Sequence, residues 1–247
     1  MAKQKSKLSK AAESRIAGYE AKSTLVEGRK EVRRKDNWRA LLVITASLAV
    51  AITAQLAYFN LGPGIPKPTP KPLTAPDTSV AQNRIWNGSM TVAGKPIEFE
   101  LFGDKAPKAV ANFVTLAQKG FYDANNCHRL TTEGIFVLQC GDPQGDGSGG
   151  PGYNFGPVEN APADNVYEGG VIAMARQGNN ATSMGSQFFI VYGSSMIPSD
   201  SAGGYTVFGK VTKGLNSIRE LAKDGTVDGK GDGKPKNPIA LGGVRVN

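Results

Sequence analysis

Two polar side chains that could act together in one site stand ten residues apart in the second half of the sequence. Arg129 precedes a polar turn and Gln139 follows the apolar run after that turn, which is the pattern of a β-hairpin. Because side chains alternate between the faces of a strand, Val137 and Gln139 share a face, opposite the strand that carries Arg129. A cationic fork and an amide beside a valine, with Phe136 close by, predict a site that is part polar and part apolar.

Five motifs occur in order over about half of the chain: His128-Arg129, Phe136-x-x-Gln139-x-Gly141-Asp142, Met174-Ala175, Gly185-Ser186-Gln187-Phe188-Phe189 and Val207-Phe208-Gly209. A set of five ordered motifs is far more specific than any one of them. Together they resemble the cyclophilin family of peptidyl-prolyl isomerases. The resemblance implies an all-β fold, a closed antiparallel eight-stranded cyclophilin-like β-barrel capped by two α-helices, and an activity that rotates X-Pro peptide bonds.

The same resemblance assigns roles residue by residue. Arg129 matches the family's catalytic arginine, and Gln139 the polar partner that steadies it. No nucleophile, metal or cofactor is required by such a reaction. The remaining matches are expected to bind the substrate, either around the proline ring or along the groove for the residues before it: Phe136, Val137, Met174, Phe189, Ala175, Arg176, Gln187 and Tyr205.

Several positions depart from the family pattern. Cys127 replaces a phenylalanine, two residues are inserted between Arg129 and Phe136, and Arg176 stands where asparagine is frequent, which predicts an added positive charge beside the groove. The segment 196–205 replaces the family's Trp-Leu-Asp-Gly-Lys-His stretch. The tryptophan that favours cyclosporin binding therefore has no counterpart, and weak inhibition by cyclosporin is expected.

Other kinds of site are disfavoured by composition. His128 is the only histidine, which excludes a metal site built on several histidines, and it is expected to be a hydrogen-bonded structural residue on the inner face of the barrel. The glycine-rich stretch 141–156 lacks the Gly-Lys-Ser/Thr ending of a phosphate loop. The acidic run 224–232 lacks the closing glutamate of a calcium loop and favours a plain surface turn.

Cys127 and Cys140 are the only cysteines, and they lie in facing strands of a domain expected outside the cell, where disulfides persist. Strict alternation places Cys127 on the face of Arg129 and Cys140 on the other, which would separate the two Cβ atoms. A bulge in the longer turn would shift this register. The sequence leaves the disulfide open.

The domain expected over 81–247 reads as short strands with two helices. The stretch 84–103 alternates as two hairpin strands, and further strands are expected at 171–175, 187–192, 205–211 and 239–246. A helix over 106–119 has apolar residues at helical spacing, with Asp104 as its expected cap. A second helix is expected over 215–223.

The basic charge of the chain is concentrated at its beginning. Residues 1–39 hold twelve Lys and Arg against five Asp and Glu, whereas 40–247 hold seventeen against sixteen. An uncharged apolar run, 40–59, follows the basic stretch and is long enough to span a bilayer as a helix, with Trp38 and Tyr58 near its ends. This pattern favours a membrane anchor, and nucleic acid is not an expected partner.

The domain organisation follows from these patterns: a basic cytoplasmic tail at 1–39, a transmembrane signal-anchor helix at 40–61, a Pro-rich linker at 62–80 and the isomerase domain at 81–247. Excess Lys and Arg before the span place the N-terminus in the cytoplasm and the catalytic domain outside the cell, in a single-pass membrane protein. Cleavage as a signal peptide stays open, since small residues occur near the end of the span. Whether the tail lies on the inner leaflet as a helix or is merely solvated also stays open.

Two functions of different class are compatible with the sequence. The first is a membrane-tethered isomerase whose substrates are proline-containing polypeptides, and which speeds the folding of exported proteins. The second is a proline-binding or chaperone module that holds such segments in the same groove with little turnover.

Overall fold

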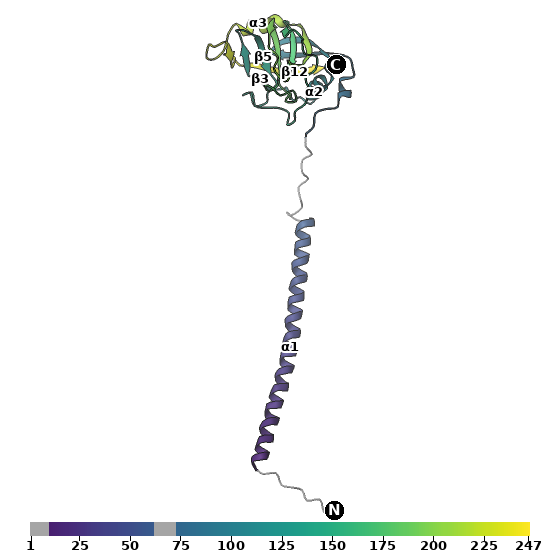
Figure 1. The fold of residues 1–247 in the computed structure, drawn as a ribbon, viewed down its shortest axis with the longest axis vertical. Coiled ribbons are helices and arrows are strands. Elements are labelled where there is room, and N and C mark those ends of the chain that lie inside the picture. Colours follow the sequence, from purple (N-terminus) through teal and green to yellow (C-terminus); the bar gives the residue numbers. More distant parts are fainter. Residues whose placement is uncertain (1–9, 62–72) are drawn as a thin grey trace, which may run out of the picture. The chain divides into compact units, whose positions relative to one another are not determined.

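The structure, a computed structural model, describes residues 10–61 and 73–247 of the chain. Contacts divide the chain into two units, and the first is a single helix, α1 (Lys10–Leu61), of 52 residues. Figure 1 shows α1 as one uninterrupted helix, so the described part of the basic stretch, from Lys10, and the transmembrane segment expected over 40–61 are parts of the same element. Within the described residues this is the one helix long and apolar enough to cross a membrane.

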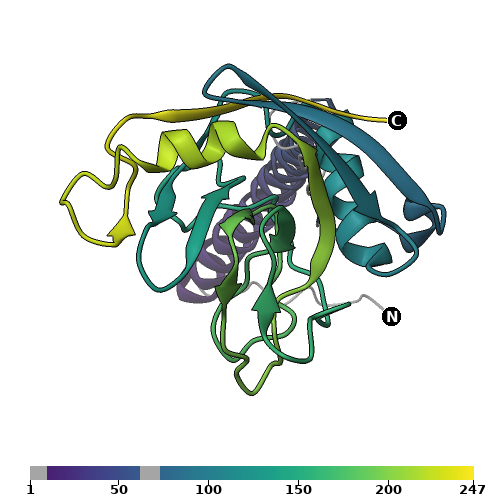
Figure 2. The same cartoon turned by 90° about the horizontal axis from the view of Figure 1, so that it is seen from above.

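The second unit is built on a ten-stranded antiparallel sheet, with strand order β11-β4-β5-β8-β7-β10-β2-β1-β12-β3. A separate pair is formed by β6 (Val166–Tyr167) and β9 (Ser195–Met196). In Figure 2, β12 runs alongside β1. The strands of the large sheet are β1 (Ile85–Val92), β2 (Lys95–Phe102), β3 (Asn125–Cys127), β4 (Arg129–Thr131), β5 (Phe136–Cys140), β7 (Val171–Met174), β8 (Phe188–Gly193), β10 (Val207–Lys213), β11 (Asp232–Gly233) and β12 (Ile239–Val246).

The expectation of eight strands in a closed barrel is not met by this sheet. Its ladder has ten strands and two free edges, β11 and β3. One of the added strands arises at His128, which separates β3 from β4, so that one expected strand becomes two that lie far apart in the order. Because β3 and β4 are joined by a single residue, the sheet must curl, which brings β3 close to β4 and β5.

Two helices pack on the sheet close to their expected bounds, α2 (Pro107–Gln118) and α3 (Leu215–Ala222). Asp104 does not cap α2, because it is exposed and the N-cap residue makes no side-chain hydrogen bond. Instead, the carboxylate of Glu159 accepts hydrogen bonds from the backbone N–H groups of Lys108 and Ala109 at 3.1–3.2 Å. A distant glutamate thus accepts hydrogen bonds from two of the backbone N–H groups that have no partner within the helix.

The core lies between the sheet and α2 and is centred on aromatic rings. Phe113 of α2 contacts the rings of Phe99, Tyr122, Phe188 and Phe208 at centroid distances of 4.9–5.9 Å. The alternation expected for the second hairpin strand is confirmed, since the inward set of β2 is buried throughout. That set is Ile97, Phe99 and Leu101.

The linker expected over 62–80 is shorter at its C-terminal end. Residues 62–72 lie outside the described residues, whereas 73–80 belong to the second unit. Residues 78–81 form a short 3₁₀ helix, η1 (Thr78–Ala81), capped by the Asp77 side chain. Ala81 is fully buried and its carbonyl accepts a hydrogen bond from the indole N–H of Trp86. The folded domain therefore begins several residues before the expected boundary.

Candidate functional site

The hairpin β4–β5 places the two expected catalytic residues directly opposite each other. Arg129 pairs with Gln139 across the ladder, so their side chains share a face. The turn is held by the buried hydroxyl of Thr131, which accepts a hydrogen bond from the N–H of Val137 at 2.9 Å. A register shift between Phe136 and Val137 in the pairing of β5 with β8 then reorients the first residue of β5.

The guanidinium of Arg129 is held on two sides. Its Nε and Nη2 donate to the two carboxylate oxygens of Asp232, at 2.8 and 2.7 Å, and its Nη1 donates to Oε1 of Gln139 at 3.2 Å. The hydrogen-bonded carboxylate raises the pKa of Arg129, and the guanidinium lowers the pKa of Asp232. Arg129 is therefore a permanent cation of fixed orientation.

Gln139 continues this contact into a polar relay. Its Nε2 donates to Oε1 of Gln187 at 2.9 Å, and Nε2 of Gln187 donates to the carbonyls of Gly147 and Gly149 at 2.9 and 2.8 Å. These bonds fix the amide orientation of both glutamines, because a backbone carbonyl can only accept a hydrogen bond and a guanidinium can only donate one. The relay ties the cation to the glycine-rich loop that walls a polar hollow of about 490 Å³.

Beside the guanidinium lies a hollow of about 460 Å³ whose lining is part polar and part apolar, and which is called the apolar hollow below after the six apolar residues that line part of it. Phe189 and Tyr205 form two of its walls, with ring centroids 5.5 Å apart in an edge-to-face arrangement. Val137 and Phe189 are buried beneath it, and all its apolar members belong to one small cluster that is distinct from the main core. The apolar lining residues are Ile135, Val137, Ala175, Phe189, Ile197 and Tyr205.

Two expected members of the apolar pocket lie elsewhere. Met174 is fully buried in the main core, and it lies opposite Phe188 in the pairing of β7 with β8. Successive side chains point to opposite faces of the chain, so Ala175 lines the hollow and Met174 does not. Phe136 packs against Tyr192 with ring centroids 6.0 Å apart, and Ile135 lines the hollow in its stead. The two inserted residues of the turn and the register shift at Phe136 account for the exchange.

Arg176 does not add a free positive charge to the groove. Its side chain is 1% exposed and forms a two-pronged ion pair with Asp200 at 2.8 and 2.9 Å. It also donates to the carbonyls of Gln177, Gly203 and Gly204, and its Cζ lies 4.7 Å from the ring centroid of Tyr205. The guanidinium lowers the pKa of Asp200 well below its ordinary value. Arg176 therefore fixes the 200–205 loop and, through it, Tyr205.

His128 lies on the side of the site rather than on the inner face of the sheet. It borders the apolar hollow with Arg129 and the exposed Asp146. Its Nδ1 is buried and has no hydrogen-bond partner among the described residues, so the expectation of a fully hydrogen-bonded histidine is wrong at this atom. Burial lowers the pKa of His128, against the opposing effect of the Asp142 carboxylate.

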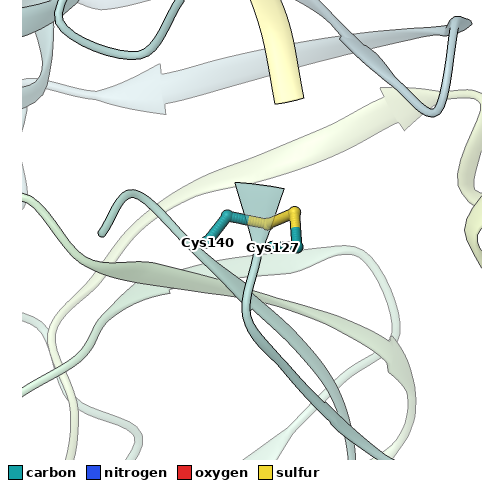
Figure 3. The surroundings of a disulfide bond; sticks show 2 residues. All are labelled: Cys127 and Cys140. Carbon is teal, nitrogen blue, oxygen red and sulfur yellow. A yellow bond between two sulfur atoms is a disulfide. The ribbon is translucent and has the colours of Figure 1, made fainter. Parts of the chain in front are cut away.

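The two cysteines form a disulfide that joins β3 to β5 (Figure 3). Both are buried in the main core, so Cys127 faces away from Arg129 rather than sharing its face. The break between β3 and β4 at His128 removes the strict alternation on which that expectation rested. The bridge lies close to both functional residues in sequence, since Cys140 directly follows Gln139 and Cys127 precedes Arg129 by two positions.

Asp232 and Ile197 are residues of the site that sequence reasoning missed, as are Ile135 and His128, which also line the hollow. Asp232 lies in the acidic run interpreted as a surface turn, yet β11 pairs with β4, opposite Thr131. Ile197 lies in the segment that departs from the family pattern. The three acids of the run have separate partners, and the described residues contain no cluster of three metal-binding side chains. Only the apolar character of Ile197 could have signalled a pocket residue.

A sequence profile described as cyclophilin type peptidyl-prolyl cis-trans isomerase matches residues 89–246, more than half of the chain. The chain belongs to this cyclophilin family. The cyclophilin domain also resembles a crystal structure of a cyclophilin-type peptidyl-prolyl cis-trans isomerase from Cryptosporidium parvum, with a TM-score of 0.56 and 28% identity. That similarity covers 66% of this chain and 98% of the other.

Two bacterial relatives extend the comparison. The probable peptidyl-prolyl cis-trans isomerase B of Mycobacterium tuberculosis is 39% identical over 207 residues, 76% of this chain and 65% of that protein. Peptidyl-prolyl cis-trans isomerase B of Bacillus subtilis is 43% identical over 130 residues, 52% of this chain and 85% of that protein. The chain thus spans slightly less than two thirds of the first relative and most of the second.

Proposed function

We propose that this cyclophilin is a peptidyl-prolyl cis-trans isomerase that acts on proline-containing polypeptides. The observation that carries the proposal is the pairing of a fixed guanidinium, Arg129, with the apolar hollow formed by Val137, Phe189, Ile197 and Tyr205. An apolar hollow with a few convergent polar groups is the usual form of a binding site. Such a hollow accepts the proline ring, and the neighbouring polar hollow beside Gln187 accepts the residues that precede it.

The chemistry of rotation requires little beyond these groups. Delocalisation of the imide nitrogen lone pair into the carbonyl creates a barrier of roughly 18–20 kcal/mol. In the twisted transition state the lone pair returns to the nitrogen, which becomes a hydrogen-bond acceptor. A donor of Arg129 fixed beside the proline ring binds this twisted form better than either planar form, and this difference in binding lowers the barrier. No bond is broken, and neither metal nor cofactor takes part.

Arg129 has donors left for this task. A guanidinium has five N–H groups, of which three are used by Asp232 and Gln139, so that one N–H on each of Nη1 and Nη2 is unused by these contacts. A crystal structure of the Cryptosporidium parvum relative was obtained in the presence of the dipeptide Ala-Pro. That choice of ligand supports a short X-Pro peptide as the probe for this chain.

Exchange spectroscopy by NMR on an Ala-Pro tetrapeptide tests the proposal with the full chain in detergent micelles. We expect the wild type to speed cis-trans exchange, and Arg129→Ala to lose more than about tenfold of kcat/KM. Arg245→Ala is the matched control, because Arg245 is also an arginine but lies outside the hollow. A wild type that binds the peptide without speeding exchange would instead identify a proline-binding or chaperone module.

We further propose that α1 anchors the cyclophilin domain outside the cell membrane, with the basic stretch at 1–39 in the cytoplasm. The uncharged run at 40–59 and the excess of Lys and Arg before it support this orientation. The described residues of the run are exposed in the structure, as a lipid-facing helix requires. In this arrangement residues 62–72 are the spacer, and exported proteins are the proposed clients.

The mass of the mature protein and its exposure to added protease test this topology. An intact N-terminus with a cyclophilin domain digested from outside whole cells supports the single-pass anchor. A mature chain that begins after residue 54 would identify a cleaved signal peptide instead.

Weak cyclosporin binding is also proposed. The chain has two tryptophans, Trp38 in α1 and the buried Trp86 in β1, and neither lines the hollow. Ile197 and Tyr205, from the divergent segment, line the hollow. Titration with cyclosporin should therefore inhibit exchange only at concentrations far above those of the enzyme.

A further inference from the structure

The ion pair between Arg129 and Asp232 joins two parts of the chain that are 103 residues apart. It is two-pronged, with both carboxylate oxygens and both donors of the Nε–Nη2 side engaged at 2.8 and 2.7 Å. A fork of this kind fixes the plane of the guanidinium as well as its position. Both side chains border the apolar hollow, so the contact lies within the site.

The loop that carries Asp232 is folded around its own contacts. β11 pairs with β4, and the N–H of Thr132 donates to the carbonyl of Gly231 at 2.7 Å. At the base of the loop, the N–H of Val227 donates to the carbonyl of Lys234 at 2.9 Å, and Thr226 donates to the Asp228 carboxylate at 3.1 Å. The carboxylate of Asp232 is therefore presented to Arg129 by a preformed hairpin.

Without Asp232, the guanidinium would keep its hydrogen bond to Gln139. That contact, from Nη1 to Oε1 at 3.2 Å, is a single bond about which the fork can still rotate. The side chain of Arg129 is 40% exposed and Arg side chains are rich in rotamers, so surrounding atoms would not hold its plane. Loss of the carboxylate would then misdirect the N–H groups that reach the imide nitrogen.

We propose that Asp232 is a positioning residue, which fixes the plane of the Arg129 guanidinium for the twisted imide and does not itself touch the substrate. The inference rests on the proposed isomerase function. The pair contributes little to folding, because its two side chains are 40% and 54% exposed and exposed ion pairs add little to stability. A loss of activity without a loss of stability is therefore its signature.

Asp232→Asn is the informative variant, since asparagine keeps the shape of the side chain but has one acceptor oxygen and no charge. We expect kcat to fall about tenfold, with KM changed less than twofold and the melting temperature unchanged within about 2 °C. Asp224→Asn is the matched control, because Asp224 precedes the same loop and contacts Asn237 instead of Arg129. A fall in melting temperature that parallels the fall in kcat would overturn the proposal.

A double-mutant cycle separates positioning from an independent role. When Arg129 is already Ala, Asp232→Asn should change the residual kcat/KM less than twofold, whereas an independent effect would persist at about tenfold. The Nε–H resonance of Arg129 gives a readout that needs no turnover. We expect slow solvent exchange in the wild type and fast exchange in Asp232→Asn. Slow exchange in both proteins overturns the positioning role, and a wild type without turnover overturns the isomerase function alone.

Discussion

Reduction of the Cys127–Cys140 disulfide should lower the stability of the cyclophilin domain without removing its activity. The bridge joins β3, at one edge of the sheet, to β5, near the other, and so fastens one edge of the curled sheet to a strand near its other edge. The backbone N–H of the neighbouring His128 also donates to the carbonyl of Gln139 at 3.0 Å, a bond that remains after reduction. Below the melting temperature, Arg129 therefore stays opposite Gln139.

The size of the effect follows from the length of chain that the bridge closes. The two cysteines are separated by 13 positions. Loop-closure entropy for a loop of about 15 residues corresponds to about 3 kcal/mol in the free energy of unfolding. For a domain of this size, each kcal/mol shifts the melting temperature by roughly 2–4 °C, so a decrease of roughly 6–12 °C is expected.

Thermal unfolding of the full chain in micelles, with and without dithiothreitol, measures this decrease, and a thiol assay confirms the reduction. A variant with Cys127→Ser and Cys140→Ser is the control, since it should melt at the lower temperature in both conditions. An unchanged melting temperature in fully reduced wild type would refute the reasoning. So would a loss of isomerase activity at 25 °C in the reduced but folded protein.

Three further predictions concern groups of the site. Lowering the pH from 7 to 5 should reduce the free energy of unfolding, because burial lowers the folded pKa of His128 and the unfolded chain therefore binds the proton more readily. The variant His128→Gln should lack this part of the pH dependence, and an equal pH dependence in both proteins would contradict the prediction. Asp200→Ala should lower the melting temperature more than Arg176→Leu, because loss of the Asp200 carboxylate leaves the buried guanidinium of Arg176 without its ion-pair partner. A larger decrease in Arg176→Leu would refute this interpretation. Phe189→Leu should raise KM roughly fivefold with kcat within twofold, and a change confined to kcat would speak against a role in ring binding.

Local patterns in the sequence predicted the elements that carry the site. Period-two alternation found both hairpins, and apolar spacing found α2 and α3 within one residue of each observed end. Such signals are local, since a strand or helix face is set by residues a few positions apart. The opposition of Arg129 and Gln139 followed from the same signal.

Contacts between distant segments were beyond the reach of these patterns. Glu159 caps α2 from 50 residues away, and Asp232 reaches Arg129 across 103 residues. The acidic run that contains Asp232 is typical of exposed turns, and nothing local marks one carboxylate as a partner of an arginine. Long-range pairs of this kind are set by the fold as a whole.

The remaining differences arise where the backbone interrupts its own alternation. A single residue, His128, separates β3 from β4 and turns Cys127 inward, which permits the disulfide. Met174 shows the opposite case, because strict alternation with Ala175 already excluded both residues from one face. There, motif resemblance assigned a role that the period of the strand denies.

The division of the Arg129→Ala effect between catalysis and binding tests the central claim most directly. If the guanidinium of Arg129 engages the imide nitrogen in the twisted state, kcat should fall more than about tenfold while the Kd of the Ala-Pro tetrapeptide changes less than about threefold. Line-shape analysis by NMR yields both quantities from one titration. A Kd that rises as much as kcat/KM falls would show that Arg129 only holds the peptide, and would contradict the account.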